Sequence, residues 1–178
     1  PRRQFVDGAD LQIGQVGHRQ RAGDGRGAHH QQVWLELGAF QLAAQLHTGQ
    51  VDKAGRPYIE HLTRVFLRVQ ASGGVLSQQI AALLHDAIED GHATADDLVR
   101  IAGVPVEAVE LVVALSRRAD QPYLDYLAAV KASPDAALVK LADLEDNGDP
   151  ARLDLLPEKD GLRLRKKYAQ AVRFMTEA

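Results

Sequence analysis

The chain has 178 residues, of which 46% are hydrophobic and 25% are charged, and both values are ordinary for a soluble globular protein. It contains no cysteine, which excludes disulfides, thiolate metal sites and a cysteine nucleophile. Its formal net charge of −3 provides no general attraction to nucleic acid or to an anionic membrane, so we expect neither as a partner.

Residues 1–32 differ from the rest of the chain, because they are rich in glycine, glutamine and arginine and show no sustained hydrophobic period. The segment GDGRG within them has no preceding strand and no following Lys-Ser/Thr, so it does not indicate a phosphate-binding loop. We interpret this segment as a flexible N-terminal arm, either native or foreign to the natural coding sequence. It lacks the apolar stretch of a signal peptide, and we expect a cytoplasmic protein.

From residue 33 onward, apolar residues recur at helical spacing. Pro57 is expected at the start of one helix, Ser77 is a candidate cap for another that runs to about Asp90, and TADD (94–97) has the pattern of a capping box. The expected helices cover 35–47, 57–72, 77–90, 94–103, 105–116, 122–132, 134–147 and 158–176. No alternating run of strand length occurs, so the pattern predicts an all-α bundle of about eight helices.

The stretch LLHDAIED (83–90) raises the question of function. Its ionisable residues are His85, Asp86, Glu89 and Asp90, and they follow directly on an apolar run. One interpretation is an amphipathic helix with a solvated face. The other is a cluster of metal ligands, which is favoured because no lysine or arginine between 69 and 99 balances the three carboxylates. A bound cation would relieve their repulsion.

Two other helices carry residues that suit the same cluster. In PDAALVKLADLEDN (134–147), apolar residues cover most of the circumference, while Lys140, Asp143 and Asn147 share one seam. A buried aspartate there must be paired or bound to metal, and an ion pair with Lys140 is the structural alternative. His61 borders the apolar stripe of the helix after Pro57, where a histidine standing alone is usually a core residue.

Together, His61, His85, Asp86 and Asp143 form a nitrogen and oxygen set that suits Mn²⁺, Fe²⁺, Zn²⁺ or Ni²⁺. Four protein ligands leave positions open for water and a substrate oxygen. Glu89 would then be near enough, with Asp90, to orient or deprotonate the water or to protonate a leaving group. Such a site suits hydrolysis of a phosphoester or a pyrophosphate.

The segments HTGQVDKAGRPYIEH, LLHDAIED and VKLADLEDN, in this order and spacing, resemble the HD-domain hydrolases of the RelA/SpoT type, including the small stand-alone alarmone hydrolases. The resemblance covers residues 47–147 and extends plausibly to about 176, so that 33–178 would form the hydrolase domain. It implies an all-helical HD fold, a divalent metal that is typically Mn²⁺, and removal of pyrophosphate from the 3′ position of (p)ppGpp.

The resemblance also implies roles for individual residues. The metal ligands of the family fall on His61, His85, Asp86 and Asp143, and its catalytic acidic pair falls on Glu89 and Asp90. The substrate-contacting lysine of the first motif matches Lys53, and the asparagine after the third motif matches Asn147. Lys140 and Tyr123 are further candidate contacts to a nucleotide substrate, although packing would equally explain Tyr123.

One departure concerns recognition of the base. The family commonly has Arg-Lys in the first motif, with the arginine against guanine, whereas this chain has Asp52–Lys53. An aspartate cannot make that stacking contact and would place negative charge near an anionic substrate. A hydrolase for another phosphorylated small molecule, or a module that binds nucleotide without cleaving it, therefore remain alternatives. The oligomeric state is left open.

Overall fold

The computed structural model describes residues 25–177, and the regular secondary structure of this range is helical, apart from one isolated bridge between Val51 and Pro57. The all-α class and the number of helices agree with expectation. The elements are α1 (Gly25–Leu46), α2 (Tyr58–Ala71), α3 (Leu76–Leu84), the π-helical turn η1 (Asp97–Ile101), α4 (Val106–Leu115), α5 (Tyr123–Lys131), α6 (Pro134–Asn147), α7 (Pro150–Leu153) and α8 (Glu158–Thr176).

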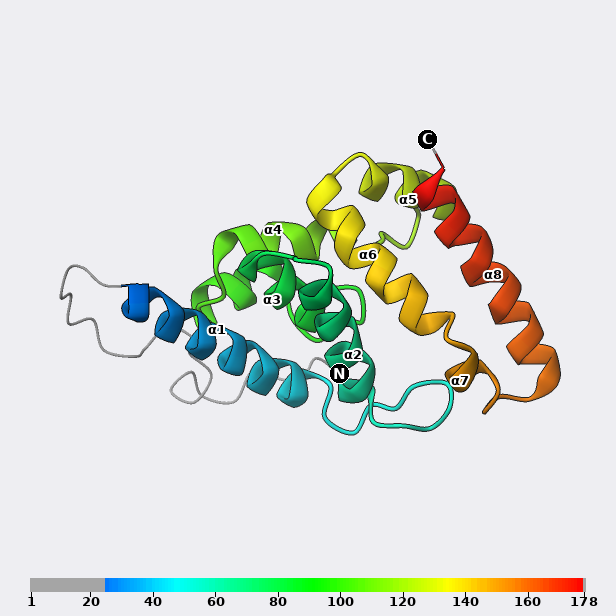
Figure 1. The fold of residues 1–178 in the computed structure, drawn as a ribbon, viewed down its shortest axis with the longest axis horizontal. Helices are drawn as coiled ribbons and strands as arrows, with labels where there is room; N and C mark the ends of the chain where they lie inside the picture. The colour runs from blue at the N-terminus through cyan, green and yellow to red at the C-terminus, as the bar shows by residue number, and fades with distance from the viewer. Residues whose placement is uncertain (1–24, 178) are drawn as a thin grey trace.

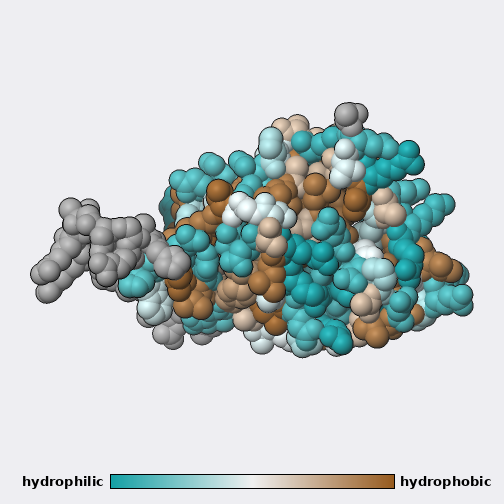
Figure 2. Space-filling model, in the orientation of Figure 1, coloured by the Kyte–Doolittle hydropathy of each residue, from teal (hydrophilic) through white to brown (hydrophobic). Residues whose placement is uncertain are grey.

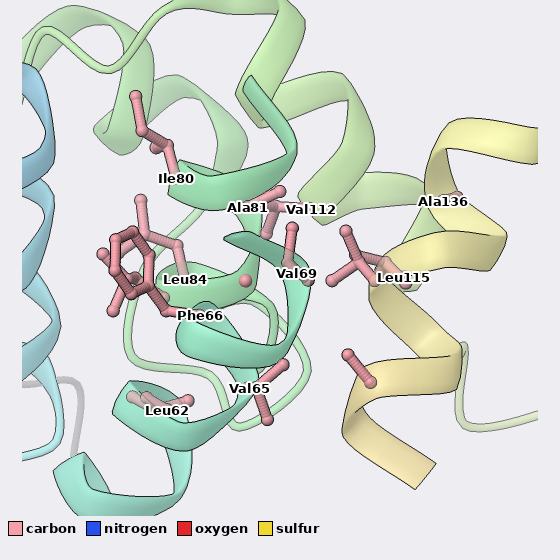
Figure 3. Packing of buried hydrophobic residues seen from close by; sticks show 14 of the residues in the cluster. Leu62, Val65, Phe66, Val69, Ile80, Ala81, Leu84, Val112, Leu115 and Ala136 are labelled. Carbon is pink, nitrogen blue, oxygen red and sulfur yellow. The ribbon is translucent and has the colours of Figure 1, made fainter. Parts of the chain in front are cut away.

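Helices α2 and α3 form the centre of the bundle. Helix α3 packs against α1, α2, α4 and α6, and α8 packs against α6 at the far end of the molecule (Figure 1). Every residue of α3 from Ile80 to Leu84 is fully buried, so this helix has no solvated face. Figure 3 shows that Val65 and Val69 point from α2 toward α6, and that Phe66 lies close to Leu84.

Prolines mark the starts of most helices. Pro57, Pro105, Pro122 and Pro157 each stand directly before the first residue of a helix, and α6 begins on Pro134 itself. Proline lacks the backbone N–H that would be unsatisfied there, and its fixed φ is compatible with entry into a helix. This local chemistry explains why the expected boundaries of α4, α5, α6 and α8 lie within one or two residues of those observed.

The starts of two helices differ from expectation. Helix α1 begins at Gly25, ten residues before the expected start at 35, since helix propagation costs less than nucleation. Residues 1–24 of the expected arm lie outside the described residues, and the arm stays a prediction. Helix α3 starts at Leu76, where the Gln78 side chain accepts the Val75 N–H, so Ser77 is not its cap. The short helix α7 was not expected.

The capping box at Thr94 is confirmed. Its hydroxyl accepts the backbone N–H of Asp97 at 3.1 Å, and the Asp97 carboxylate accepts the backbone N–H of Thr94 at 2.9 Å. The visible surface in Figure 2 mixes hydrophilic and hydrophobic residues. Among the described residues, none of the helices combines the length and the apolar character needed to cross a bilayer.

The packing of α1 makes a prediction about stability. Leu42 is 2% exposed and Leu37 is 53% exposed on the same helix, so they form a matched pair. Leu42→Ala should lower the free energy of unfolding by about 2–5 kcal/mol, because it leaves a cavity in the core. Leu37→Ala should change it by less than about 0.5 kcal/mol. Urea denaturation of both variants measures the difference, and equal small effects would mean that α1 does not pack on the core.

Candidate metal centre and active site

Two buried histidines face each other between α2 and the end of α3. His61 is 1% exposed and His85 is 2% exposed, and their ring centroids lie 5.4 Å apart. The Nε2 atoms of both rings are buried and have no hydrogen-bond partner among the described residues. Buried polar atoms are rarely left in this state, so two of them side by side indicate a missing ligand.

Two carboxylates complete this cluster. Asp143 Oδ1 lies 3.3 Å from His61 Nε2 and 3.5 Å from His85 Nε2, while Asp86 Oδ2 lies 3.1 Å from His85 Nε2. One ligand atom from each of His61, His85 and Asp86 falls within 4.8 Å of the others, a spacing that suits one metal ion. The structure thus brings together all four residues that the sequence suggested as ligands.

The opposite sides of the two rings are already bonded. His85 Nδ1 lies 2.8 Å from the carbonyl oxygen of Ala82, and His61 Nδ1 lies 2.7 Å from Oδ2 of Asp146. Both partners are acceptors, which favours a proton on each Nδ1, and the Asp146 contact is shorter than the 3.3 Å between His61 Nδ1 and Arg152 Nη1. In the neutral ring, Nε2 therefore presents its lone pair to the cluster, as a metal-binding histidine requires. This arrangement fits a divalent metal.

Asp146 is a functional candidate that the sequence analysis missed. It is fully buried, and besides His61 it accepts hydrogen bonds from Arg64 Nε at 2.7 Å and from Arg152. Burial acts to raise the pKa of its carboxyl, but the bonds from His61 and Arg64 dominate and hold that pKa at about 2. The available signal was its position three residues after Asp143, which places both on the same side of α6.

Tyr58 is a second residue that was missed. Its hydroxyl donates a hydrogen bond to Oδ2 of Asp86. The residue lies in the quoted first motif, but no periodicity distinguishes it from a packing tyrosine. Because Tyr58 opens α2 and Asp86 follows α3, this bond fixes the carboxylate from a neighbouring element. Partners of this kind tune a metal site through its ligands.

The carboxylates of the cluster favour the protonated form of both histidines. Burial acts to lower the pKa of His85, but the Asp86 and Asp143 carboxylates overcome it and raise that pKa well above its ordinary value. The pKa of His61 is raised for the same reason, and that of the Asp143 carboxyl lies well below its usual range because Lys140 and the two histidines outweigh burial. Metal binding therefore competes with protonation of both histidines.

The structural alternative for Asp143 is also present in the fold. Lys140 Nζ donates to Oδ2 of Asp143 at 2.8 Å, and Asn147 donates to Oδ1. The ion pair uses one carboxylate oxygen, while the other lies beside the two histidines. The pair and the histidine cluster therefore coexist, and neither interpretation excludes the other.

Glu89 and Asp90 lie on a turn instead of a helix, which corrects the expectation that the helix runs to Asp90. The backbone tightens after Leu84, whose carbonyl accepts the N–H of Ala87, and the segment closes at Gly91 with a φ of 74°. Glu89 and Asp90 are both exposed beside the buried ligands. Oε2 of Glu89 accepts the backbone N–H of Arg117 at 2.9 Å.

A cleft of about 280 Å³ opens next to this turn. Its polar walls include Lys53, Asp90 and Asn147, and its apolar wall is formed by Leu153, Leu156, Leu164 and Tyr168. Two of the four expected substrate contacts, Lys53 and Asn147, therefore line the cleft, whereas Lys140 pairs with Asp143 and does not line it. Tyr123 lies on α5, with its ring 6.2 Å from that of Tyr126 and 5.2 Å from Lys167 Nζ.

Asp52 does not present an unpaired charge to the cleft, which corrects the expectation from the first motif. Its Oδ1 accepts the backbone N–H groups of Ala54 and Arg56 at 2.8 and 3.0 Å, and its Oδ2 pairs with Arg152 at 2.8 Å. Burial acts to raise the pKa of this carboxyl, but these bonds lower it overall. The aspartate holds the loop together and is neutralised by Arg152.

The profile of the HD domain family matches residues 39–143, a span that contains every expected ligand. The chain belongs to the HD domain family. This HD domain is 33% identical over 116 residues to the guanosine-3′,5′-bis(diphosphate) 3′-pyrophosphohydrolase of Aquifex aeolicus, covering 61% of the chain and 16% of that protein. It is 30% identical over 135 residues to a probable GTP pyrophosphokinase of Mycobacterium leprae, covering 72% of the chain and 17% of that protein.

A solved structure shares the fold of this HD domain. It is described as a metazoan ortholog of SpoT that hydrolyses ppGpp, and it superposes with a TM-score of 0.63 at 20% identity, over 88% of this chain and 89% of that one. The chain thus covers most of the length of the solved relative. It spans only about a sixth of the length of the proteins from Aquifex aeolicus and Mycobacterium leprae.

The carboxylate behind His61 leads to a prediction about metal affinity. Asp146→Asn keeps the shape of the side chain but removes its charge, and such changes typically weaken metal binding about 10–100-fold. Glu145→Gln is the matched control, because Glu145 is an exposed neighbour on α6. Competition with a chelator measures both affinities for Mn²⁺. An unchanged affinity in Asp146→Asn would mean that His61 does not depend on this carboxylate to bind metal.

Proposed function

We propose that this HD domain is a metal-dependent hydrolase that removes the 3′-pyrophosphate from (p)ppGpp or a similar nucleotide. The observation that carries the proposal is the pair of buried, unbonded Nε2 atoms of His61 and His85 beside two carboxylates. Two relatives support the choice of substrate. The protein of Aquifex aeolicus is named for this activity, and the solved metazoan relative is described as hydrolysing ppGpp.

The four residues His61, His85, Asp86 and Asp143 would hold a divalent metal, for which we propose Mn²⁺ because the donors are nitrogen and oxygen. A bound ion would lower the pKa of a water and neutralise phosphate charge. Asp146 orients the first histidine, Ala82 O orients the second, and Tyr58 orients Asp86.

The exposed acidic pair supplies proton transfer in this proposal. Glu89 and Asp90 stand on the turn that carries two ligands, and Asp90 also lines the cleft. Their place suits a group that takes a proton from the attacking water and returns one to the leaving oxygen of the 3′ group. The products would be pyrophosphate and GDP or GTP.

Positive charge around the cleft supports a substrate with several phosphates. Burial lowers the pKa of Lys167, and so do the nearby charges of Lys53, Lys140 and Arg117. Lys167 is therefore repelled by the cations around it, and a bound polyanion would relieve this repulsion. Lys53 is exposed at the cleft, so it is placed to reach a phosphate.

A second candidate is hydrolysis of another phosphorylated small molecule, and position 52 favours it. The carboxylate of Asp52 is committed to Arg152 and to the loop backbone, so no cation is available there to stack on guanine. Both candidates use the same ligands and the same acidic pair, and they differ only in what the cleft accepts.

A panel of nucleotides separates the candidates. Mn²⁺-loaded protein is incubated with ppGpp, pppGpp, nucleoside monophosphates and a dinucleotide phosphate, and the products are identified by chromatography. Release of pyrophosphate and GDP from ppGpp supports the first candidate. Turnover of another phosphoester with ppGpp left intact would replace it by the second.

The acidic pair makes a prediction about turnover. Glu89→Gln and Asp90→Asn keep the size of each side chain but remove its capacity for proton transfer. Each should lower kcat about 10²–10⁴-fold, while Mn²⁺ content stays at the level of the parent protein. Steady-state kinetics with metal analysis measure both quantities, and unchanged turnover in both variants would make them ordinary solvated residues.

A further inference from the structure

A network of polar side chains links the turn that carries Asp90 to the loop before α2. The side chain of Gln50 donates from Nε2 to Oδ2 of Asp90 at 2.8 Å. Its amide oxygen lies 2.8 Å from Nδ1 of His47 and 2.8 Å from Nε2 of His92. One amide therefore contacts three side chains at once, although Gln50 is itself only partly buried.

The orientation of the amide follows from charge. A carbonyl oxygen only accepts, so the two ring nitrogens that face it must both carry protons. Turning the amide over would place its oxygen 2.8 Å from the Asp90 carboxylate, where two acceptors repel. His47 must then be the Nδ1–H tautomer, which leaves its buried Nε2 without a partner among the described residues. Burial lowers the pKa of His47, in agreement with a neutral ring.

The backbone of Gln50 is held as firmly as its side chain. Its N–H donates to the carbonyl of His47 at 3.0 Å across a turn in which Gly49 has a φ of 76°. Its carbonyl accepts the N–H of Tyr58 at 3.0 Å. The turn at Gly91 directs the chain back, so that His92 lies beside Gln50, and the backbone N–H of His92 donates to the carbonyl of Ala87 at 2.9 Å.

We propose that Gln50, oriented by His47 and His92, is the positioning residue that holds Asp90 toward the cleft for proton transfer. The inference rests on the proposed function, in which Asp90 acts as an acid–base group. Asp90 is exposed and lies on a turn, so without the amide its carboxylate would be free to change rotamer. Fixing one oxygen through Gln50 leaves the other oxygen for a water or the substrate.

The same three residues also have ligand spacing, because atoms of His47, Asp90 and His92 lie within 4.8 Å of one another. A second metal is the rival explanation of the cluster. It is less favoured, since both ring nitrogens already share one amide oxygen and the third group already accepts from the amide nitrogen.

The kinetic test uses Gln50→Leu, which keeps the size of the side chain but removes both polar ends. Misplacing a catalytic group typically costs up to about a hundredfold, so kcat should fall about tenfold to hundredfold with KM and Mn²⁺ content unchanged. Gln70→Leu makes the same chemical change at an exposed site of α2 and should behave as the parent protein.

The double variant Gln50→Leu/Asp90→Asn decides whether Gln50 acts through Asp90. Its kcat should equal that of Asp90→Asn alone, because positioning has no value once the acid–base group is gone. Effects that multiply would overturn the inference, and so would loss of Mn²⁺ from Gln50→Leu or a second equivalent of bound Mn²⁺ in the parent protein.

A readout independent of activity is the tautomer of His47, observed by ¹⁵N NMR of the imidazole. The parent protein and Gln70→Leu should show protonation at Nδ1, and Gln50→Leu should lose it. An Nε2–H tautomer in the parent would overturn the network. Absence of ppGpp hydrolysis together with the expected tautomer would instead refute the proposed substrate while supporting the network.

Discussion

The buried carboxylate of Asp146 is the interaction on which the rest of the site depends. A charge with no exposed surface must be compensated, and here His61 and Arg64 of α2 and Arg152 of α7 all bond to it. Arg152 extends the connection to Asp52 in the loop before α2. One side chain of α6 thereby fixes a metal-facing histidine, a neighbouring helix and a wall of the cleft in a single arrangement.

The loop from His47 to Tyr58 plays a comparable part for the turn after α3. It reaches that turn at two points, through Tyr58 to Asp86 and through Gln50 to Asp90. The three residues between those aspartates include Ala87, whose N–H donates to the carbonyl of Leu84, and the exposed Glu89. The loop, which has little regular structure, thus bonds to both ends of this turn. Without these side-chain bonds, the turn would be held mainly by the hydrogen bonds of its own backbone.

Much of this could be predicted from the sequence, because it depends on local patterns. Helical spacing and prolines predict α4, α5, α6 and α8 closely, and the three motifs indicate the ligands that the fold brings together. What could not be predicted depends on distant partners. Asp146 differs from an ordinary helix aspartate through His61 and Arg64, which are distant in sequence, and through Arg152. Asp52 likewise pairs with a residue 100 positions away. The turn after Leu84 was not predicted either, because the apolar residues up to Ile88 keep helical spacing although the helix has already ended.

The Asp52–Arg152 pair also restricts how this protein can diverge. A single change of Asp52 to arginine would set two guanidinium groups together and remove the acceptor for the N–H groups of Ala54 and Arg56. Loss of the Arg152 side chain alone would leave the carboxylate of Asp52 without its ion-pair partner and remove two hydrogen bonds to Asp146. Each change is harmful without the other, so positions 52 and 152 are coupled, and a substitution at either one depends on the residue at the other.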